Sequence, residues 1–278
     1  MKKINLNSEI LDHIPDAISL VQRGLYYHDS LFESIRVFSG QIPFIQQHWE
    51  RLERGLKLMR YDIPAYWSSA FFEHEILKIA SLNARIRLTV WRGQGGLYAP
   101  SDNTPLFLIT VQTLNATVFD WLESGLKVCL SETVRLPLDA YSGLKTLNAS
   151  RYVAAALEAR ERGFDDAIIL NSRDSVCEAV GGNVCWIKSN QIYTTPLADG
   201  ALTGIMRGLL LTLTFDIDKP IIEKSITFAQ LIEADELFLT NAIRGIVPVS
   251  NLEGKDFETH QTKQLFEVLV GFISQKVK

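Results

Sequence analysis

The clearest periodic pattern of apolar residues lies over residues 44–60. Side chains four positions apart share one face of a helix, so this pattern predicts an amphipathic helix. A second helix is predicted over residues 66–82. The positions that carry the first pattern are Phe44, His48, Leu52 and Leu56.

Three runs in the first half are typical of strands. Residues 31–38 mix apolar and polar positions like a strand or a short helix, and a turn at Gly40 follows them. Arg85–Trp91 and Leu106–Thr113 are strand-like and flank a loop rich in Gly, Pro, Asp and Asn, which predicts a hairpin with a long mobile tip. These elements predict an α+β unit that ends near residue 113.

A linker is expected over residues 114–124, followed by a second mixed unit. We therefore predict an N-terminal α/β domain over 1–113 and a larger C-terminal domain over 125–278, in a mixed α+β fold. The Ala-rich helix over 146–162 should stop at Gly163, because glycine commonly follows a helix end. The other predicted elements are strands at 125–130, 167–171 and 237–240, a hairpin of 184–188 with 191–195 across Ser189-Asn190, and helices at 204–214 and 261–276.

Composition narrows the class of protein. Of the 278 residues, 47% are hydrophobic and 22% are charged, as in globular domains. The net charge of −4 gives no basic footprint for nucleic-acid binding. The N-terminus lacks the apolar core of a secretory signal, and no apolar run approaches the ~20 residues that span a bilayer. Three widely spaced cysteines fit reduced thiols and no zinc site, so we expect a cytoplasmic protein without membrane or metal.

Lys145 is the first candidate for chemistry. It stands in Gly143-Leu-Lys-Thr-Leu-Asn, just before a predicted helix and among small and apolar residues. Burial there would lower its pKa and make the amine a nucleophile. The alternative is a solvated lysine at a helix start.

Glu178 is the second candidate. Apolar and small residues surround it, and Gly181 and Gly182 allow a backbone or ligand to approach closely. A carboxylate buried in such a place needs a partner. The alternative is a glutamate on an edge strand that faces water.

The third candidate is the segment Leu202-Thr-Gly-Ile-Met-Arg. Gly204 precedes a predicted helix, so the N–H groups of Ile205 and Met206 would point out of its N-terminus and form an anion site. Ordinary helix initiation is the alternative. Together, an amine, a carboxylate and an anion cradle are the groups that pyridoxal phosphate requires from a protein.

The chain has none of three other common motifs. No GxGxxG follows a strand, which leaves dinucleotide binding without support, and neither a GxSxG elbow nor HExxH occurs.

On this basis the chain resembles the class IV, or fold type IV, pyridoxal-phosphate enzymes, which include branched-chain and D-amino-acid aminotransferases and aminodeoxychorismate lyases. The resemblance runs from about residue 24 to residue 250 and rests on the order and spacing of short motifs. These are Leu31-Phe-Glu-Ser-Ile-Arg36, His48-Trp-Glu-Arg51-Leu, Arg92-Gly-Gln-Gly-Gly, Lys145-Thr-Leu-Asn148, Glu178 with Asn183, Thr195-Pro, Gly204-Ile-Met-Arg207 and Asn241-Ala-Ile-Arg-Gly-Ile-Val-Pro-Val.

The resemblance implies a fold and a set of roles. It implies a small N-terminal α/β domain, a C-terminal pseudo-barrel domain and a homodimer. Lys145 would form the Schiff base and shuttle protons, and Glu178 would hold the pyridine nitrogen protonated. The phosphate would be bound by Arg51, the turn Gly204, Ile205 and Met206, and the loop Thr240, Asn241 and Ala242. Tyr27, Arg36 and Arg92 would contact substrate.

The resemblance leaves the reaction open between two classes. The Arg-Gly-x-Gly-Gly loop, Gly204-Ile-Met-Arg and the Asn-Ala…Pro-Val pattern favour 4-amino-4-deoxychorismate lyase, which releases pyruvate and 4-aminobenzoate for folate synthesis. The alternative is a branched-chain or D-amino-acid aminotransferase, and Phe32-Glu-Ser-Ile-Arg36 resembles the branched-chain pattern. No histidine lies between His74 and His260, so the carboxylate trap of D-amino-acid aminotransferases is missing. A non-catalytic protein on this fold would have lost the lysine or the carboxylate, and both are present.

Overall fold

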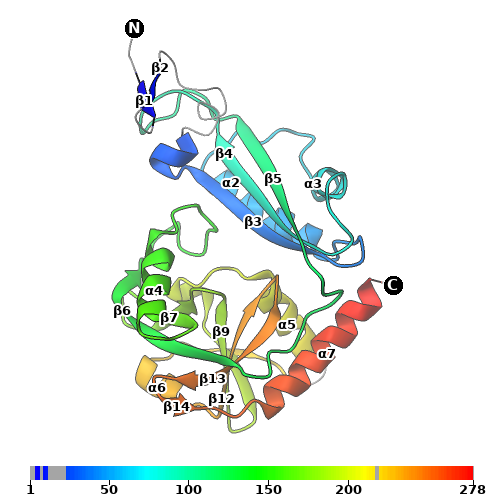
Figure 1. The fold of residues 1–278 in the computed structure, drawn as a ribbon, viewed down its shortest axis with the longest axis vertical. Coiled ribbons are helices and arrows are strands. Elements are labelled where there is room, and N and C mark those ends of the chain that lie inside the picture. Colours follow the sequence, from blue (N-terminus) through cyan, green and yellow to red (C-terminus); the bar gives the residue numbers. More distant parts are fainter. Residues whose placement is uncertain (1–3, 7–8, 12–22, 217–218, 278) are drawn as a thin grey trace.

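The computed structural model describes residues 4–6, 9–11, 23–216 and 219–277. Most of the first 22 residues of the predicted N-terminal domain, and residue 278, therefore lie outside the described residues. Besides a short hairpin of β1 (Ile4–Leu6) and β2 (Glu9–Leu11), two sheets form the molecule (Figure 1). We call residues 23–113 the N-terminal part and residues 125–277 the C-terminal part.

The N-terminal part is an antiparallel sheet in the order β3–β4–β5, with two helices packed on it. Alternate side chains of β3 and β4 are buried against the helices, as a half-buried strand requires. The amphipathic pattern at 44–60 and the hairpin were thus predicted correctly, and the segment expected to be a strand or a short helix is a strand over Ser30–Val37. The elements are β3 (Ser30–Val37), α2 (Ile45–Leu58), α3 (Ser69–Leu77), β4 (Ala84–Arg92) and β5 (Pro105–Thr113).

The opposite face of this sheet is polar. Ser34 pairs with Arg87 and Arg36 pairs with Arg85 across β3 and β4, so their side chains share that face. Phe32 precedes them on the same side of β3. The sheet therefore presents arginines toward the C-terminal part, which lies below it in Figure 1.

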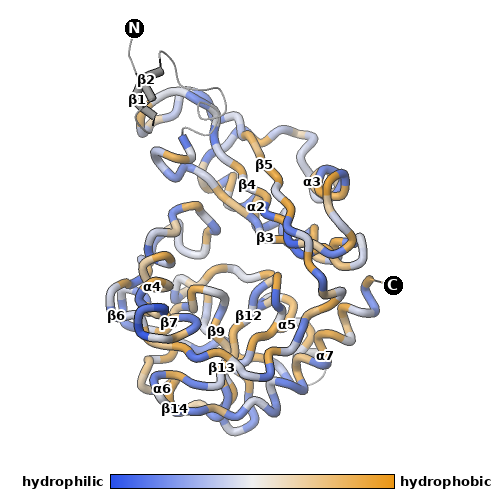
Figure 2. Tube along the Cα trace, viewed as in Figure 1, coloured by the Kyte–Doolittle hydropathy of each residue, from blue (hydrophilic) through white to orange (hydrophobic). Residues whose placement is uncertain are grey.

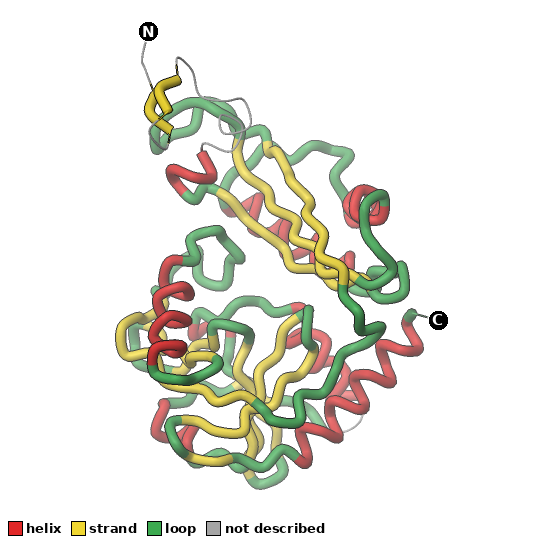
Figure 3. Tube along the Cα trace, viewed as in Figure 1, coloured by secondary structure: helices red, strands yellow, loops and turns green. Residues whose placement is uncertain are grey.

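The C-terminal part is built on a mixed nine-stranded sheet in the order β11-β10-β9-β12-β13-β6-β7-β8, with β14 paired to β13. Figure 3 shows its strands curving around one another while helices lie outside them. Its elements are β6 (Leu126–Leu136), α4 (Ser150–Glu161), β7 (Asp166–Asn171), β8 (Val176–Ala179), β9 (Asn183–Lys188), β10 (Gln191–Thr194), η1 (Leu197–Asp199), α5 (Ile205–Asp216), β11 (Ile222–Glu223), α6 (Phe228–Ile232), β12 (Glu236–Asn241), β13 (Gly245–Leu252), β14 (Lys255–Asp256) and α7 (His260–Lys276).

Clusters of buried apolar side chains pack between this sheet and its helices, and Figure 2 shows hydrophobic residues along many of these elements. One cluster joins α5 and α7 to β12 through Leu210, Leu269 and Phe238, all fully buried. A second cluster includes Leu231 of α6 and lies among the strands. Phe38 of the N-terminal part belongs to the first cluster, so the two parts share some of their core.

Helix α4 begins later than its sequence pattern predicts, at Ser150 rather than residue 146. The preceding residues pair with β3 instead: the N–H of Phe32 donates to the carbonyl of Lys145, and the N–H of Leu147 donates to that of Ser30. Hydrogen bonds to a distant strand thus outweigh local helix propensity. Gly163 takes a left-handed φ of 81° directly after the helix end, as expected.

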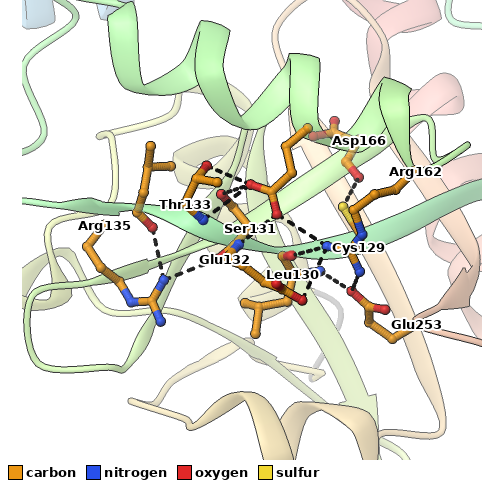
Figure 4. A network of polar contacts seen from close by, with 11 residues as sticks. Cys129, Leu130, Ser131, Glu132, Thr133, Arg135, Arg162, Asp166 and Glu253 are labelled. Carbon is orange, nitrogen blue, oxygen red and sulfur yellow. Dashed lines mark hydrogen bonds and ion pairs between the residues drawn. The ribbon is translucent and has the colours of Figure 1, made fainter.

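Glu158 fixes α4 on β6 through hydrogen bonds to Ser131, Glu132 and Thr133. Figure 4 shows these three residues of β6 in a polar network with Arg162 and Glu253. Burial raises the pKa of the Glu158 carboxyl, but hydrogen bonds from the Glu132 N–H and from Ser131 and Thr133 outweigh it and lower the pKa to about 2. Arg162 joins this carboxylate to Glu253 on the turn after β13. The helix that follows Lys145 is therefore held in a defined position.

Within the described residues, no helix is both long enough and apolar enough to cross a membrane.

Candidate active site

Lys145 lies in a cavity of about 440 Å³ between the two parts of the molecule. Its Nζ stands 4.4 Å from the centre of the Phe32 ring, on the arginine-bearing face of the N-terminal sheet. Burial and the positive charge of Arg51 lower the pKa of Lys145 to about 8, although Glu33 and Glu178 oppose them. Near neutral pH this amine therefore gives up its proton more readily than an ordinary lysine.

Glu178 lines the same cavity from β8 and is only 4% exposed. Its Oε1 accepts from the Tyr152 hydroxyl at 2.5 Å, and its Oε2 accepts from the Leu202 N–H at 2.8 Å. Burial raises the pKa of this carboxyl above its ordinary value, although those two donors and the charges of Lys145 and Arg51 oppose the rise. The water-facing alternative for Glu178 is thereby excluded.

Arg51 reaches the cavity from α2 and is held from both ends. Its Nε and Nη2 donate to the carboxylate of Glu33, and its Nη1 donates to the Thr203 carbonyl at 2.8 Å. His48 adds a further contact to Glu33 at 2.7 Å. The guanidinium is thus fixed beside the start of α5.

The turn before α5 supplies the third predicted feature. Gly204 and Ile205 line the cavity, whereas the Met206 side chain is buried in the core. A Cβ on Gly204 would collide with Asn183, whose amide donates to the Leu202 carbonyl. The glycine is therefore needed where the backbone turns into the helix beside the cavity.

The end of β12, with Thr240 and Asn241, and the loop that follows it from Ala242 close the cavity on another side. The Oγ1 of Thr240 is buried and has no hydrogen-bond partner. Asn241 Oδ1 accepts from the N–H groups of Ile243 and Arg244, and its Nδ2 donates to the Gly181 carbonyl. Its side chain therefore joins the two loops that border this side.

These residues fit pyridoxal phosphate. A buried hydroxyl without a partner costs free energy, and a phosphate oxygen would satisfy Thr240 Oγ1. Arg51 and the first N–H groups of α5 lie on the same cavity and suit an anion. Glu178 and Lys145 supply the carboxylate and amine that the cofactor's ring nitrogen and aldehyde require.

The three predicted substrate contacts lie elsewhere. Arg36 does not line the Lys145 cavity. Its guanidinium donates to the carbonyls of Ile243, Ala116 and Val118. Tyr27 and Arg92 line a neighbouring cavity of about 850 Å³.

In that neighbouring cavity Arg92 binds Asp29 and the carbonyls of Met59 and Arg60, which leaves it embedded in the N-terminal part. Arg23 lies 4.8 Å from the Tyr27 ring. Leu144, Thr146 and Tyr152 line both cavities, so the two adjoin.

Sequence reasoning missed four residues of the site: Glu33, Arg85, Arg87 and Tyr152. Arg87 and Arg85 line the Lys145 cavity, and the Arg87 guanidinium stands 3.9 Å from the Phe32 ring centre. The alternation Arg85-Ile-Arg87 on a predicted strand was a usable indication that both point to one face. Nothing local indicates the contact of Tyr152 with a residue 26 positions away.

Comparison with known proteins agrees with this geometry. A family model for amino-transferase class IV matches residues 30–252. A Methanocaldococcus jannaschii protein, provisionally named a branched-chain-amino-acid aminotransferase, is 30% identical over 99% of this chain and 94% of its own. The aminodeoxychorismate lyase of Vibrio harveyi is 28% identical over 88% of this chain and 89% of its own.

The fold has a close counterpart among solved structures. The branched-chain amino acid aminotransferase of Escherichia coli superposes with a TM-score of 0.82 at 22% identity, covering 98% of this chain and 94% of that one. The predicted fold type IV architecture is thereby confirmed.

Proposed function

The chain belongs to the amino-transferase class IV family, and on that premise we propose that it is a 4-amino-4-deoxychorismate lyase, which releases pyruvate and 4-aminobenzoate. Enzymes of this family depend on pyridoxal phosphate, so the chain is an enzyme with that cofactor. The observation that carries the lyase is the pair Arg85 and Arg87 on the wall of the Lys145 cavity, while the desolvated amine of Lys145 beside Glu178 and Arg51 supports the cofactor chemistry common to the family.

Each residue of the cavity has its own role in the proposed reaction. When bound, pyridoxal phosphate withdraws electrons from the substrate carbon that bears the nitrogen. Lys145 holds the cofactor, then removes the proton from that carbon; its pKa of about 8 suits such exchange near neutral pH. Glu178 holds the ring nitrogen, while Arg51 and the α5 N-terminus hold the phosphate and keep the ring in place.

The cavity wall formed by the N-terminal sheet supports a substrate with more than one carboxylate. Arg85 and Arg87 line the cavity from β4, and guanidinium groups pair well with carboxylates. 4-Amino-4-deoxychorismate carries two carboxylates. A branched-chain amino acid carries one and an apolar side chain, which suits an apolar wall better.

A second candidate is an aminotransferase, because the Methanocaldococcus jannaschii relative carries that name. Both reactions begin with proton removal by Lys145. They differ afterwards, when the lyase expels a leaving group and the aminotransferase returns a proton to the cofactor. Glutamate, the amino donor of many aminotransferases, would also suit the arginines.

The central assignment is tested by reduction with borohydride. The purified protein should be yellow, and reduction should fix the mass of the cofactor on the peptide that contains Lys145. The Lys145→Ala variant should fold, lose turnover and take up no label. A colourless protein, or label on another lysine, would overturn the assignment.

The reaction is tested by substrate competition. The protein is offered 4-amino-4-deoxychorismate and, separately, branched-chain and D-amino acids with 2-oxoglutarate. Release of pyruvate from the first alone supports the lyase. Transfer of amino groups to 2-oxoglutarate, with no pyruvate released from 4-amino-4-deoxychorismate, supports the second candidate.

We also propose a homodimer. Leu97 and Tyr98, in the loop between β4 and β5, are 75% and 90% exposed, which is unusual for such apolar side chains unless a partner covers them. Light scattering should give twice the 31.3 kDa mass of the chain, and a monomer would contradict the proposal.

A further inference from the structure

The Tyr152 hydroxyl joins the Glu178 carboxylate to the helix following Lys145. Tyr152 lies in the first turn of α4 and lines both cavities. Its position on α4 is fixed independently, because Glu158 of the same helix is bound to β6. The hydroxyl therefore approaches Glu178 from a rigid support.

The direction of this hydrogen bond is determined by the surroundings. Burial and the negative charge of Glu178 hold the pKa of the Tyr152 hydroxyl well above its usual range, so the hydroxyl keeps its proton and donates it. The Leu202 N–H is also a donor only. Each carboxylate oxygen of Glu178 thus accepts one hydrogen bond, which fixes the plane of the group.

We propose that Tyr152 is a positioning residue, whose hydroxyl orients the Glu178 carboxylate and keeps it ionised for the ring nitrogen of pyridoxal phosphate. The inference rests on the proposed role of Glu178. Tyr152 would thus affect how firmly the cofactor is held by acting on Glu178, without touching the cofactor itself.

Several other groups face Glu178, and they set what the hydroxyl can contribute. Lys145 and Arg51 favour the ionised carboxylate by charge, and the Leu202 N–H favours it by hydrogen bonding, while burial opposes all of them. The adjacent Cys177 thiol stays protonated because burial raises its pKa. Removing the Tyr152 donor alone should therefore raise the pKa of Glu178.

The Tyr152→Phe variant separates this role from packing, because it keeps the ring and removes only the hydroxyl. The cofactor is removed, and the affinity for pyridoxal phosphate is measured from pH 5 to 9 by the change in absorbance. Affinity should fall at low pH as Glu178 takes up a proton. In Tyr152→Phe this fall should begin about one pH unit higher, so that affinity at a pH within the fall drops about ten-fold relative to the wild type. The phosphate's own ionisation contributes equally to both proteins.

Two further variants make the result specific. Tyr61→Phe removes another buried tyrosine hydroxyl, one that donates to the Asp29 carbonyl far from Glu178, and should leave the pH profile unchanged. In a Glu178→Gln background, Tyr152→Phe should produce no further shift, because no carboxyl remains to titrate.

The outcomes distinguish failure of the proposed function from failure of the role given to Tyr152. Wild-type protein that binds no pyridoxal phosphate would overturn the proposed function and this role with it. Wild-type protein that binds it, with a Tyr152→Phe profile that coincides with the wild-type profile, would overturn the role of Tyr152 alone. An equal loss of affinity in the Glu178→Gln background would show a structural effect and would also overturn it.

Discussion

Glu33 is the buried anion on which the position of Arg51 depends. It is 1% exposed and accepts hydrogen bonds from both Arg51 and His48. Burial raises the pKa of its carboxyl, but the charge and hydrogen bonds of Arg51 outweigh this and lower it to about 2. A neutral group at this position would leave Arg51 as a buried cation without an anion.

We expect Glu33→Gln to destabilise the protein by about 3 kcal/mol, because the loss of one partner leaves the other charge buried. Urea unfolding measures this change. Glu53→Gln is the matched control, since the pair of Glu53 with Lys57 is exposed and should contribute less than about 1 kcal/mol. Equal stability of the two variants would contradict the role given to Glu33.

The same carboxylate predicts how stability changes in acid. The pKa of Glu33 in the folded protein, about 2, lies below its ordinary value of 4.5. Its contribution is therefore complete above pH 4.5 and is lost as the pH falls toward 2. Glu33→Gln should flatten the stability profile over that range, as measured by urea unfolding at several pH values; a profile parallel to the wild type would count against it.

Lys145 gives a second prediction at this scale. In protein freed of cofactor, its reaction with a small acylating reagent should rise around pH 8, because only the neutral amine reacts and its pKa is about 8. Peptide mass spectrometry follows the label across pH. The peptide with the exposed Lys57 provides the reference curve from the same digest. A Lys145 curve that rises near the ordinary value of 10.5 would contradict the desolvated amine.

At the scale of elements, the sequence predicted turns and helices whose conformation depends on neighbouring residues in the chain. Ser189 and Asn190 both take positive φ in the tight turn between β9 and β10, as the hairpin prediction requires. Strand β13 went unpredicted, although its residues were noted as a motif, because its pairing is with β12 and β6. Helix α4 was placed four residues too early, because pairing with β3 claims the residues before it.

The same distinction explains which site residues could be predicted. Lys145, Glu178 and the Gly204 turn carry local motifs, and the structure brings them to one cavity. Glu33 and Tyr152 act through partners on other elements, and a single sequence does not show such contacts. Burial, which decides between the two interpretations of Lys145, is also a property of the assembled fold.

Gly204, directly before α5, and Gly208, within it, allow a matched test of the helix start. A Cβ on Gly204 would collide with Asn183, whereas a Cβ on Gly208 would meet no atom within 4 Å. We expect Gly204→Ala to destabilise the protein by about 1–3 kcal/mol through overpacking and to weaken binding of pyridoxal phosphate. Gly208→Ala should stabilise it by about 0.5–1 kcal/mol, because alanine suits a helix interior better. Thermal unfolding and cofactor titration measure both, and similar effects of the two substitutions would contradict the close contact.

At the scale of the whole molecule, the site requires the two parts to stay together. Lys145 and Glu178 come from one part and Arg51 from the other. We propose that the parts are separate domains joined by residues 114–124, since no helix or strand lies between β5 and β6. Arg36 then acts between them: from β3 it donates to two carbonyls of the joining segment and to the Ile243 carbonyl at 2.7 Å.

Arg36→Lys should loosen this connection while keeping the charge. Lysine carries a single ammonium group and cannot reproduce three hydrogen bonds to separate carbonyls in one plane. We expect faster cleavage within residues 114–124 in limited proteolysis. We also expect weaker binding of pyridoxal phosphate, because Arg51 no longer stays aligned with the α5 N-terminus.

Arg54→Lys, on an exposed position of α2, is the control and should be cleaved like the wild type. Arg36 lies over the Phe38 and Phe119 rings, and the aliphatic stem of lysine can keep that packing, so both parts should remain folded, as circular dichroism would report. Wild-type rates of cleavage in Arg36→Lys would show that the shared apolar cluster around Phe38 and Phe119, whose rings stand 5.2 Å apart, holds the parts together without the arginine.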